Sequence, residues 1–298
     1  MDAPTEHRAG FVAITGRTNV GKSTLLNRLV GQKVAAVTHR PQTTRRRILG
    51  IRSDPDAQFL LIDMPGIHES RRAINERMAQ TARRAISEGE VLLVMIEAGP
   101  RLSAEDQAML AELRAMKRPV VIAVNKIDLK PRSYVLPMLE EIGREFPEAE
   151  LVPISARSGD NVEELLAVIK RSLPVSPSLM SEEEFTDQSE RMIAAEIIRE
   201  KIFLKMREEI PFSTAVVIED FVEEPERQLK KISARIVVER EPHKGMLIGA
   251  GGRTLKEIGT AARLELEEIL GSRVFLEMRV RVDRDWTRDP HKLSEYGL

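Results

Sequence analysis

The strongest constraint on the fold is the octapeptide GRTNVGKS at residues 16–23, which follows directly on the apolar run Phe11–Thr15. It is a complete G-x-x-x-x-G-K-[ST] sequence. In such loops glycines permit a tight turn, so that backbone N–H groups converge on a phosphate at the N-terminus of a helix. The apolar spacing in Lys22–Val30 predicts that helix. A strand, a phosphate loop and a helix in this order predict an α/β fold.

Short apolar runs alternate with amphipathic helical patterns as far as about residue 172. Strands are predicted at Phe11–Thr15, Ile48–Arg52, Phe59–Ile62, Val91–Ile96, Val120–Val124 and Leu151–Ile154. Helices are predicted at Lys22–Val30, Arg72–Ser87, Ala104–Met116, Tyr134–Glu145 and Val162–Ser172. The alternation predicts a mixed, mainly parallel six-stranded sheet with helices on both faces. Such sheets bind ligands at the C-terminal ends of their strands.

The pattern changes after residue 173. Residues 174–190 are rich in proline, serine and acidic residues, and they predict a linker between a domain of residues 1–173 and one of residues 191–298. In the second domain, helices are predicted at Arg191–Glu208 and Gly251–Leu270, and strands at Ser213–Val222, Lys230–Glu239 and Val274–Val282. Two consecutive strands between helices indicate a smaller α+β domain.

The composition narrows the classes of protein. The chain has no cysteine, which excludes disulfides and cysteine-based metal sites. Its 46 basic and 47 acidic residues leave a net charge of -1, so a nucleic-acid surface must come from local clustering. The apolar runs are far shorter than the roughly 20 residues that cross a bilayer, and the polar start lacks the pattern of a secretory signal. We expect a cytoplasmic protein.

Residues at the ends of the predicted strands indicate a nucleotide site. Lys22 would neutralise β- and γ-phosphate oxygens, and the Ser23 hydroxyl is a hard oxygen ligand for Mg²⁺. The run Asp63-Met64-Pro65-Gly66 follows the third predicted strand. There Asp63 would hold a Mg²⁺-bound water, and the Gly66 N–H would meet the γ-phosphate.

Two further loops point to the base of the nucleotide. Asn125-Lys126-Ile127-Asp128 follows the strand Val120–Val124, and the Asp128 carboxylate offers two acceptor oxygens to the ring N–H and exocyclic amine of guanine. Adenine lacks this donor pair, so Asp128 predicts GTP rather than ATP. Ser155-Ala156, after the last predicted strand, would close over the base.

A segment with adjacent threonines, Pro41-Gln42-Thr43-Thr44-Arg45, lies between the first helix and the second strand. A threonine there would ligate Mg²⁺ and sense the γ-phosphate, which would order the segment only in the GTP state. We favour Thr44, with Thr43 as the alternative, so the predicted metal ligands are Ser23, Thr44 and Asp63. The predicted GTP-binding residues are Gly16, Arg17, Thr18, Asn19, Val20, Gly21, Lys22, Ser23, Thr24, Asp63, Met64, Pro65, Gly66, Ile67, Asn125, Lys126, Asp128, Ser155 and Ala156.

With these motifs the chain resembles the Era family of translation-factor-related GTPases over nearly all of its length. The features that carry the resemblance are GRTNVGKS, PQTTRRR, DMPGIH, NKID, ISA and HKGMLIGAGGRTLKEIG. The resemblance implies a GTPase domain followed by a KH-type (type II) RNA-binding domain. It also implies a protein that binds 16S rRNA near its 3′ end and assists assembly of the small (30S) ribosomal subunit. We expect a monomer, with peripheral contact to the inner face of the cell membrane as a further expectation.

The sequence departs from the family pattern at a few positions. Thr18 stands where the family usually has proline, and Met64 where it usually has threonine. The loop Gly249–Gly252 lacks the basic residue that a KH loop usually carries, although basic residues flank it. The alternative for this loop is a glycine turn that only starts a helix. The predicted RNA-binding residues are Lys244, Met246, Ile248, Gly249, Ala250, Gly251, Gly252, Arg253 and Lys256.

The predicted catalytic residues are Lys22, Thr44 and Gly66. The residue after Gly66 is Ile67, where many GTPases place a glutamine that orients the attacking water, so we expect slow intrinsic turnover. The resemblance also implies that Asn19 helps to hold a K⁺ ion, with stabilisation of the loop as the alternative. Arg45–Arg47 would touch RNA or form a solvated edge strand. The rival function is a GTP-switched adaptor whose second domain binds a protein or membrane surface.

Overall fold

The computed structural model describes residues 6–40, 43–65, 73–207 and 209–297. The chain divides into two compact units. Described residues of the first unit are 6–34, 46–65 and 78–187, and those of the second are 35–40, 43–45, 73–77, 188–207 and 209–297. In the described part of the chain, no helix is long and apolar enough to cross a membrane.

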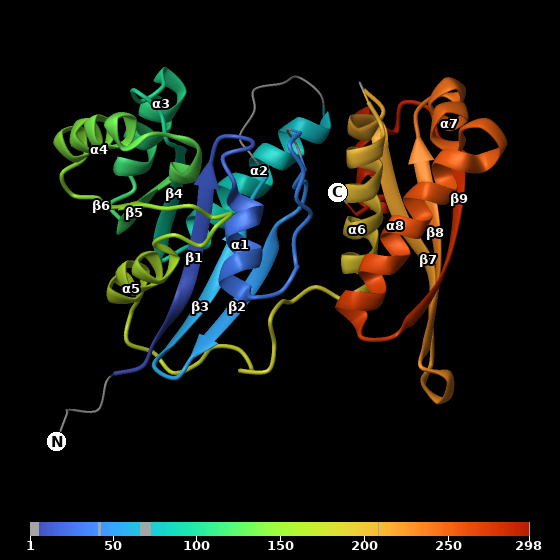
Figure 1. The fold of residues 1–298 in the computed structure, drawn as a ribbon, viewed down its shortest axis with the longest axis horizontal. Coiled ribbons are helices and arrows are strands. Elements are labelled where there is room, and N and C mark those ends of the chain that lie inside the picture. Colours follow the sequence, from blue (N-terminus) through green and yellow to red (C-terminus); the bar gives the residue numbers. More distant parts are fainter. Residues whose placement is uncertain (1–5, 41–42, 66–72, 208, 298) are drawn as a thin grey trace. The chain divides into compact units, whose positions relative to one another are not determined.

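The first unit is built on a six-stranded sheet with the order β2-β3-β1-β4-β5-β6 (Figure 1). Its strands are β1 (Arg8–Gly16), β2 (Ile48–Asp54), β3 (Ala57–Asp63), β4 (Val91–Glu97), β5 (Val120–Asn125) and β6 (Glu150–Pro153). Only the pairing of β2 with β3 is antiparallel. The prediction of a mixed, mainly parallel sheet is confirmed. The carboxyl ends of β1, β3, β4 and β5 consequently lie along one edge of the sheet.

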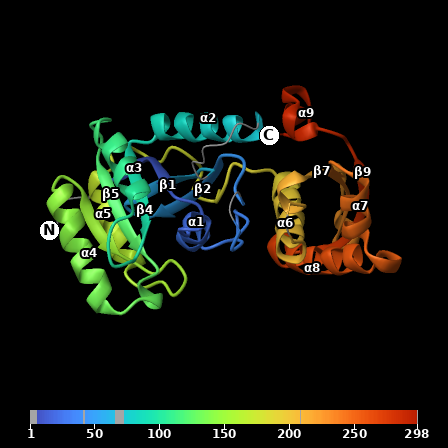
Figure 2. The same cartoon turned by 90° about the horizontal axis from the view of Figure 1, so that it is seen from above.

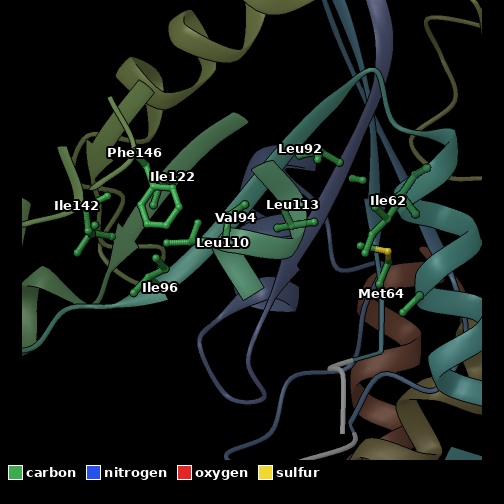
Figure 3. Packing of buried hydrophobic residues seen from close by; sticks show 14 of the residues in the cluster. Ile62, Met64, Leu92, Val94, Ile96, Leu110, Leu113, Ile122, Ile142 and Phe146 are labelled. Atoms are coloured by element: carbon green, nitrogen blue, oxygen red, sulfur yellow. The ribbon is translucent and has the colours of Figure 1, made fainter. Parts of the chain in front are cut away.

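Helices cover both faces of this sheet. They are α1 (Lys22–Val30), α2 (Ala73–Glu88), α3 (Ala104–Arg114), α4 (Arg132–Glu145) and α5 (Val162–Ser172). α2, α3 and α4 share one apolar core with the strands, in which Leu110 and Leu113 lie near Val94 (Figure 3). α1 packs on the opposite face, because its Leu26 and Val30 lie against Gly50 of β2. Burial of both faces explains why the strands read as nearly continuous apolar runs.

The first part of the predicted linker lies along the first unit. Gln58 of β3 is fully buried, and its side chain bonds the backbone of Leu179 and Met180 at 2.7–2.9 Å. The Ile51 N–H of the edge strand β2 donates to the Phe185 carbonyl oxygen at 2.9 Å. This segment therefore covers a sheet edge that would otherwise expose unpaired backbone groups.

The second unit is a three-stranded sheet packed against helices. Its elements are α6 (Glu190–Lys205), β7 (Thr214–Glu224), β8 (Leu229–Val238), α7 (Glu241–Ile248), α8 (Arg253–Leu270), β9 (Arg273–Val282) and α9 (Pro290–Glu295). β7 pairs with β8 antiparallel, and β8 with β9 parallel. The inward residues of α6, α8 and the strands form one core. Figure 2 shows these helices beside the three strands, and the α+β prediction is confirmed.

Candidate functional site

The side chain of Lys22 lies inside the phosphate loop. It is only 7% exposed, and its Nζ donates to the carbonyl oxygens of Gly16 and Arg17, each at 2.9 Å. Burial lowers the pKa of Lys22, whereas the negative charge of Asp63 opposes that shift. A desolvated cation whose hydrogen bonds go to neutral carbonyl oxygens gains strongly from an approaching phosphate, because the phosphate brings further negative charge close to it.

Two glycines shape the loop around this lysine. Gly16 has φ 144°, and a Cβ built on it would lie 2.4 Å from the carbonyl oxygen of Met95 in β4. Gly21 has φ 110°, and its Cβ would lie 2.4 Å from the side-chain nitrogen of Asn125. Any larger residue would push the loop away from the neighbouring strands, so both glycines are required by close approach as well as by backbone angle.

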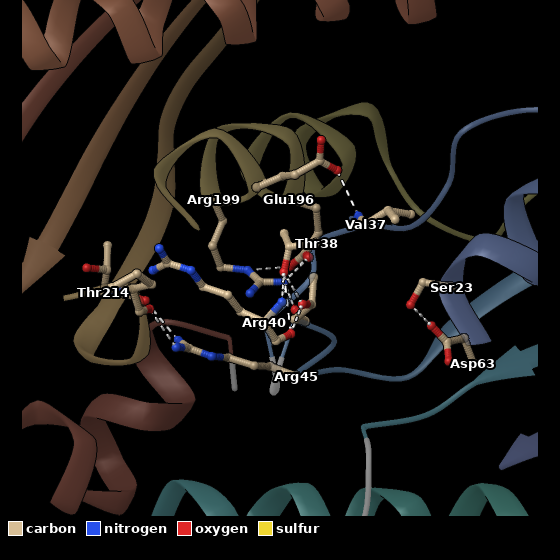
Figure 4. Close-up of polar contacts among 12 residues, drawn as sticks. Ser23, Val37, Thr38, Arg40, Arg45, Asp63, Glu196, Arg199 and Thr214 are labelled. Atoms are coloured by element: carbon tan, nitrogen blue, oxygen red, sulfur yellow. Dashed lines mark hydrogen bonds and ion pairs between the residues drawn. The ribbon is translucent and has the colours of Figure 1, made fainter. Parts of the chain in front are cut away.

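The two predicted metal ligands of the first unit meet at the start of α1. Ser23 Oγ donates to Asp63 Oδ2 at 2.7 Å, and Asp63 is fully buried at the end of β3 (Figure 4). A hydroxyl and a carboxylate are the hard oxygen donors that Mg²⁺ prefers. The donor set of Ser23 and Asp63 therefore fits a magnesium ion bound together with a nucleotide phosphate.

Asn125 connects the predicted base-binding loops to the phosphate loop. Its Nδ2 donates to the Val20 carbonyl oxygen at 2.7 Å, and its Oδ1 accepts from the Ala156 N–H at 2.8 Å. Asp128 lies exposed on the 3-10 turn Ile127–Leu129, open to a base. Lys126 Nζ pairs with Glu97 at 2.6 Å. The structure therefore joins the loops after β1, β5 and β6.

The remaining predicted nucleotide residues differ in burial. Val20, Met64 and Ser155 are buried, whereas Asn19 is exposed with a left-handed backbone at φ 62°. The predicted contacts of Gly66 and Ile67 lie outside the described residues.

The segment with Thr43 and Thr44 belongs to the second unit, whereas Ser23 and Asp63 belong to the first. Thr43 Oγ1 bonds Thr38 Oγ1 at 2.6 Å and the Arg40 carbonyl oxygen at 2.9 Å. Thr44 is buried. The magnesium role of Thr44, with Thr43 as its alternative, stays a prediction.

Arg45 anchors that segment in the second unit. Its guanidinium donates to the carbonyl oxygens of Thr214 at 2.8 Å, Phe212 at 2.8 Å and Pro211 at 3.0 Å (Figure 4). The guanidinium carbon also lies 5.8 Å from the ring centre of Phe203. A planar fork of N–H donors suits such a cluster of carbonyl groups.

Two charged residues of α6 add to this anchor, and neither was predicted from the sequence. Glu200 Oε2 accepts from the Val37 N–H at 2.8 Å, and Arg199 donates to the Thr43 carbonyl oxygen. Both side chains are buried. The available signal was their position between the apolar pairs Ile197-Ile198 and Ile202-Phe203, since charges at buried helix positions need partners.

The glycine loop of the second unit links α7 to α8. Gly249 has φ 72°, and a Cβ there would lie 2.2 Å from Thr254 Oγ1, so the first glycine is required sterically. Gly251 and Gly252 also have positive φ, but open space surrounds them. Ala250 and Gly251 are exposed. The backbone of this loop is therefore accessible to a ligand.

The predicted RNA-binding side chains surround the loop. Met246 is 49% exposed, while its neighbour Leu247 is buried in the core. Arg253 and Lys256 are exposed on the first turn of α8, and Lys244 is partly exposed on α7. Among the described residues, none of these three cations forms an ion pair within 4.0 Å. The arrangement presents apolar surface and positive charge beside open backbone.

Two family models match separate parts of the chain. A model described as a 50S ribosome-binding GTPase matches residues 11–126, and one described as a KH domain matches residues 209–287. The first match contains the phosphate loop and the start of the Asn125–Asp128 motif, and the second contains the glycine loop.

The chain is also similar to relatives over their full length. It is 46% identical over 290 residues to the GTPase Era of Syntrophus aciditrophicus (strain SB), and the alignment covers 97% of this chain and 95% of the relative. It is 44% identical over 301 residues to the GTPase Era of Stenotrophomonas maltophilia (strain K279a), which covers 100% and 99%.

Two solved structures match this chain with a TM-score of 0.94 and 40% identity. One is a point variant of Aquifex aeolicus Era bound to GDP·AlF4⁻, and the match covers 97% of this chain and 99% of that one. The other is Era in complex with MgGDPNP and nucleotides 1506–1542 of 16S ribosomal RNA, with 98% and 99% covered.

Proposed function

Because the chain belongs to the Era family of GTPases, we propose that it hydrolyses GTP and binds 16S ribosomal RNA near its 3′ end, thereby assisting 30S subunit assembly. The observation that carries the proposal is the presence, in one chain, of a complete phosphate loop and an open glycine loop between two helices. A relative that matches over 98% of the chain binds both a GTP analogue and this RNA.

The proposed nucleotide chemistry rests mainly on positioning and charge. Lys22 would neutralise the β- and γ-phosphates, and Ser23 and Asp63 would hold Mg²⁺, with Thr44 as the further ligand expected in the GTP state. The ion, when bound, supplies positive charge to the phosphate oxygens. Asp128 selects guanine. Since Ile67 has no group that can orient water, the intrinsic rate is slow.

We also propose that K⁺ assists hydrolysis beside Asn19. The exposed position and left-handed backbone of Asn19 put its peptide and side chain at the rim of the phosphate loop. Replacing Na⁺ by K⁺ should raise the hydrolysis rate, and Asn19→Ala should abolish the rise. Equal rates of the parent protein in the two salts would overturn the K⁺ proposal while leaving GTP hydrolysis in place.

RNA is the proposed ligand of the second unit. The loop Gly249–Gly252 would clamp the RNA backbone, with Lys244, Arg253 and Lys256 near its phosphates and with Met246 and Ile248 beneath its bases. The description of the family model for residues 11–126 refers to the large (50S) ribosomal subunit. The relative that matches along the full length is instead bound to RNA of the small subunit. We favour 16S rRNA over a large-subunit ligand, because the full-length match includes the residues that would contact RNA.

The test is a double variant, Ala250→Asp with Gly251→Asp. Two carboxylates beside the phosphates should weaken binding of an RNA fragment with nucleotides 1506–1542 at least about tenfold, or ~1.4 kcal/mol. Gln228→Asp with Gly271→Asp is a matched control. It adds the same charge to the same unit, at the other end of α8, and Gly271 shares the left-handed φ of Gly251.

The control variant should bind RNA like the parent, and both variants should keep GTP affinity. Parental RNA affinity in the loop variant would overturn the RNA role of this loop and favour the adaptor function.

We further propose that the protein is a cytoplasmic monomer with peripheral membrane contact. Analytical sedimentation tests the monomer, and membrane fractionation of cells tests the membrane contact.

A further inference from the structure

Arg17 connects the phosphate loop to helix α3. Its backbone carbonyl oxygen accepts one of the two hydrogen bonds from Lys22 Nζ. Its side chain leaves the loop in another direction, with Nε 3.1 Å from Asp106 Oδ1 and Nη1 3.3 Å from Glu105 Oε2. The same residue therefore touches the lysine through its backbone and α3 through its guanidinium.

Asp106 is a buried anchor for that guanidinium. It is 1% exposed, and its Oδ2 accepts a hydrogen bond from the Ser103 hydroxyl at 2.6 Å. The contact of Oδ1 with Arg17 Nε is an ion pair without hydrogen-bond alignment. A carboxylate so deeply buried requires a countercharge, and Arg17 supplies it. Glu105 has a 78% exposed side chain, and such exposed pairs contribute little.

We propose that the Arg17–Asp106 ion pair is a positioning device for Lys22 during GTP hydrolysis. The pair holds Arg17 at its side-chain end, which restricts rotation of the peptide groups whose carbonyl oxygens orient Lys22 Nζ. Electrostatic stabilisation of a transition state depends on charges that are already in place. Arg17 and Asp106 act through Lys22, so the proposal rests on the phosphate-binding role proposed for that residue.

The competing explanation is that Asp106 only helps to start α3. Ser103 is the N-cap of this helix, and its Oγ accepts from the Asp106 N–H at 3.1 Å. That cap does not need the negative charge of Asp106, because an asparagine would keep the backbone bond and accept the Ser103 hydroxyl. Substitutions at Ser103 and at Asp106 therefore separate the helix cap from the ion pair.

The experiment is a double-mutant cycle in the full chain with Arg17→Ala and Asp106→Asn. Each single variant should lower kcat at saturating GTP roughly five- to tenfold, while KM changes less. The double variant should be no slower than the slower single variant, because both remove the same interaction. Arg17→Lys, which keeps the charge, should recover part of the rate.

Ser103→Ala and Glu105→Gln are the controls. Ser103→Ala should lower the melting temperature through loss of the cap and of the hydroxyl bond to Asp106, while kcat stays within about twofold of the parent because Arg17 still pairs with the carboxylate. Glu105→Gln should also keep kcat within about twofold, since that pair is exposed. Additive losses in the cycle, or a parental kcat in Asp106→Asn, would overturn the positioning role. A Lys22→Ala variant that still binds and hydrolyses GTP like the parent would instead overturn the proposed nucleotide site. The two failures are thereby distinguishable.

Discussion

The side-chain amide of Asn125 donates a hydrogen bond to the carbonyl oxygen of Val20 at 2.7 Å. The side-chain oxygen Oδ1 of Asn125 accepts a hydrogen bond from the Ala156 N–H at 2.8 Å, and Asn125 is almost fully buried. Asn125 thus fixes the phosphate loop relative to the loop after β6 before any nucleotide arrives. A site whose loops are held in advance loses less entropy when it binds its ligand.

Replacing Asn125 by aspartate should weaken GDP and GTP binding together. A carboxylate can still accept from Ala156, but it cannot donate to Val20, so two oxygens would face each other in a buried place. Leaving a buried acceptor unsatisfied costs about 1–3 kcal/mol, or roughly a five- to 150-fold rise in Kd. Isothermal titration with GDP measures this change.

Asn161→Asp is the matched control for Asn125→Asp. The Asn161 side-chain amide also donates to a carbonyl oxygen, that of Pro153 at 2.8 Å, but it is exposed to solvent. Its substitution should leave the Kd within about twofold, since water can replace an exposed bond. Equal effects of the two substitutions would contradict the bridging role of Asn125.

Asp128→Asn should shift base preference from GTP towards XTP. An amide presents an N–H donor where guanine also presents a donor, whereas xanthine has a carbonyl oxygen at that position. Competition of unlabelled GTP and XTP against a fluorescent nucleotide gives the two affinities. An unchanged GTP-to-XTP ratio would remove Asp128 from the base site.

Arg45→Ala should destabilise the second unit by about 2–4 kcal/mol, since it leaves three carbonyl oxygens without their donor. The only tryptophan of the chain, Trp286, is fully buried in this unit and donates to the Ser213 carbonyl oxygen. Its fluorescence in a urea titration therefore reports unfolding of this unit alone.

Arg47→Ala provides the control for that titration. Arg47 pairs with Glu88 at 3.4 Å and Asp187 at 3.2 Å on the exposed surface of the first unit. Such pairs contribute about 0–1 kcal/mol, and Trp286 should not sense their loss. A urea midpoint in Arg45→Ala equal to that in Arg47→Ala would mean that the carbonyl cluster does not stabilise the fold.

Alkaline pH should destabilise the second unit through Tyr296. Burial and the hydrogen bond to Asp283 raise the pKa of Tyr296 from 10.0 to about 12. The folded state therefore keeps a proton that the unfolded state loses at pH 10. This stabilisation is complete below pH 10 and is lost as the pH rises towards 12.

The chain has two tyrosines, so the measurement uses the variant Tyr134→Phe, in which Tyr296 alone remains. Phenolate absorbance should rise with a midpoint near pH 12, and Asp283→Asn should move that midpoint down because it removes the negative charge. Glu295 adds to the rise in the pKa of Tyr296 and Arg235 opposes it, while Lys292 pairs with Asp283. A midpoint at 10 with Asp283 intact would contradict the assigned environment.

Some elements followed from local pattern and others did not. The predicted helices Lys22–Val30 and Val162–Ser172 match α1 and α5 residue for residue. α7 was missed, because Pro242 and Gly245 interrupt its short pattern. Proline is favourable at the first turn of a helix, where its missing N–H is not needed. The buried side chain of Leu247 then holds this short helix in place, and only tertiary packing supplies that contact.

Local sequence patterns were enough to predict the alternating fold and the place of the phosphate and base loops in it. The phosphate loop and the motifs that begin at Asp63 and Asn125 each lie at the end of a strand, and parallel strands bring such ends to one edge, as the pairing of Glu97 with Asn125 shows. Tertiary structure alone decided the partners of the charged side chains. Arg45 is buried among carbonyl groups while Arg47 pairs at the surface, and Arg17 reaches Asp106 on a later helix. The physical reason is that the partner of a charged side chain often lies on a segment far away in the sequence. The two segments come into contact only when the chain packs, so residue type and local spacing do not identify the partner.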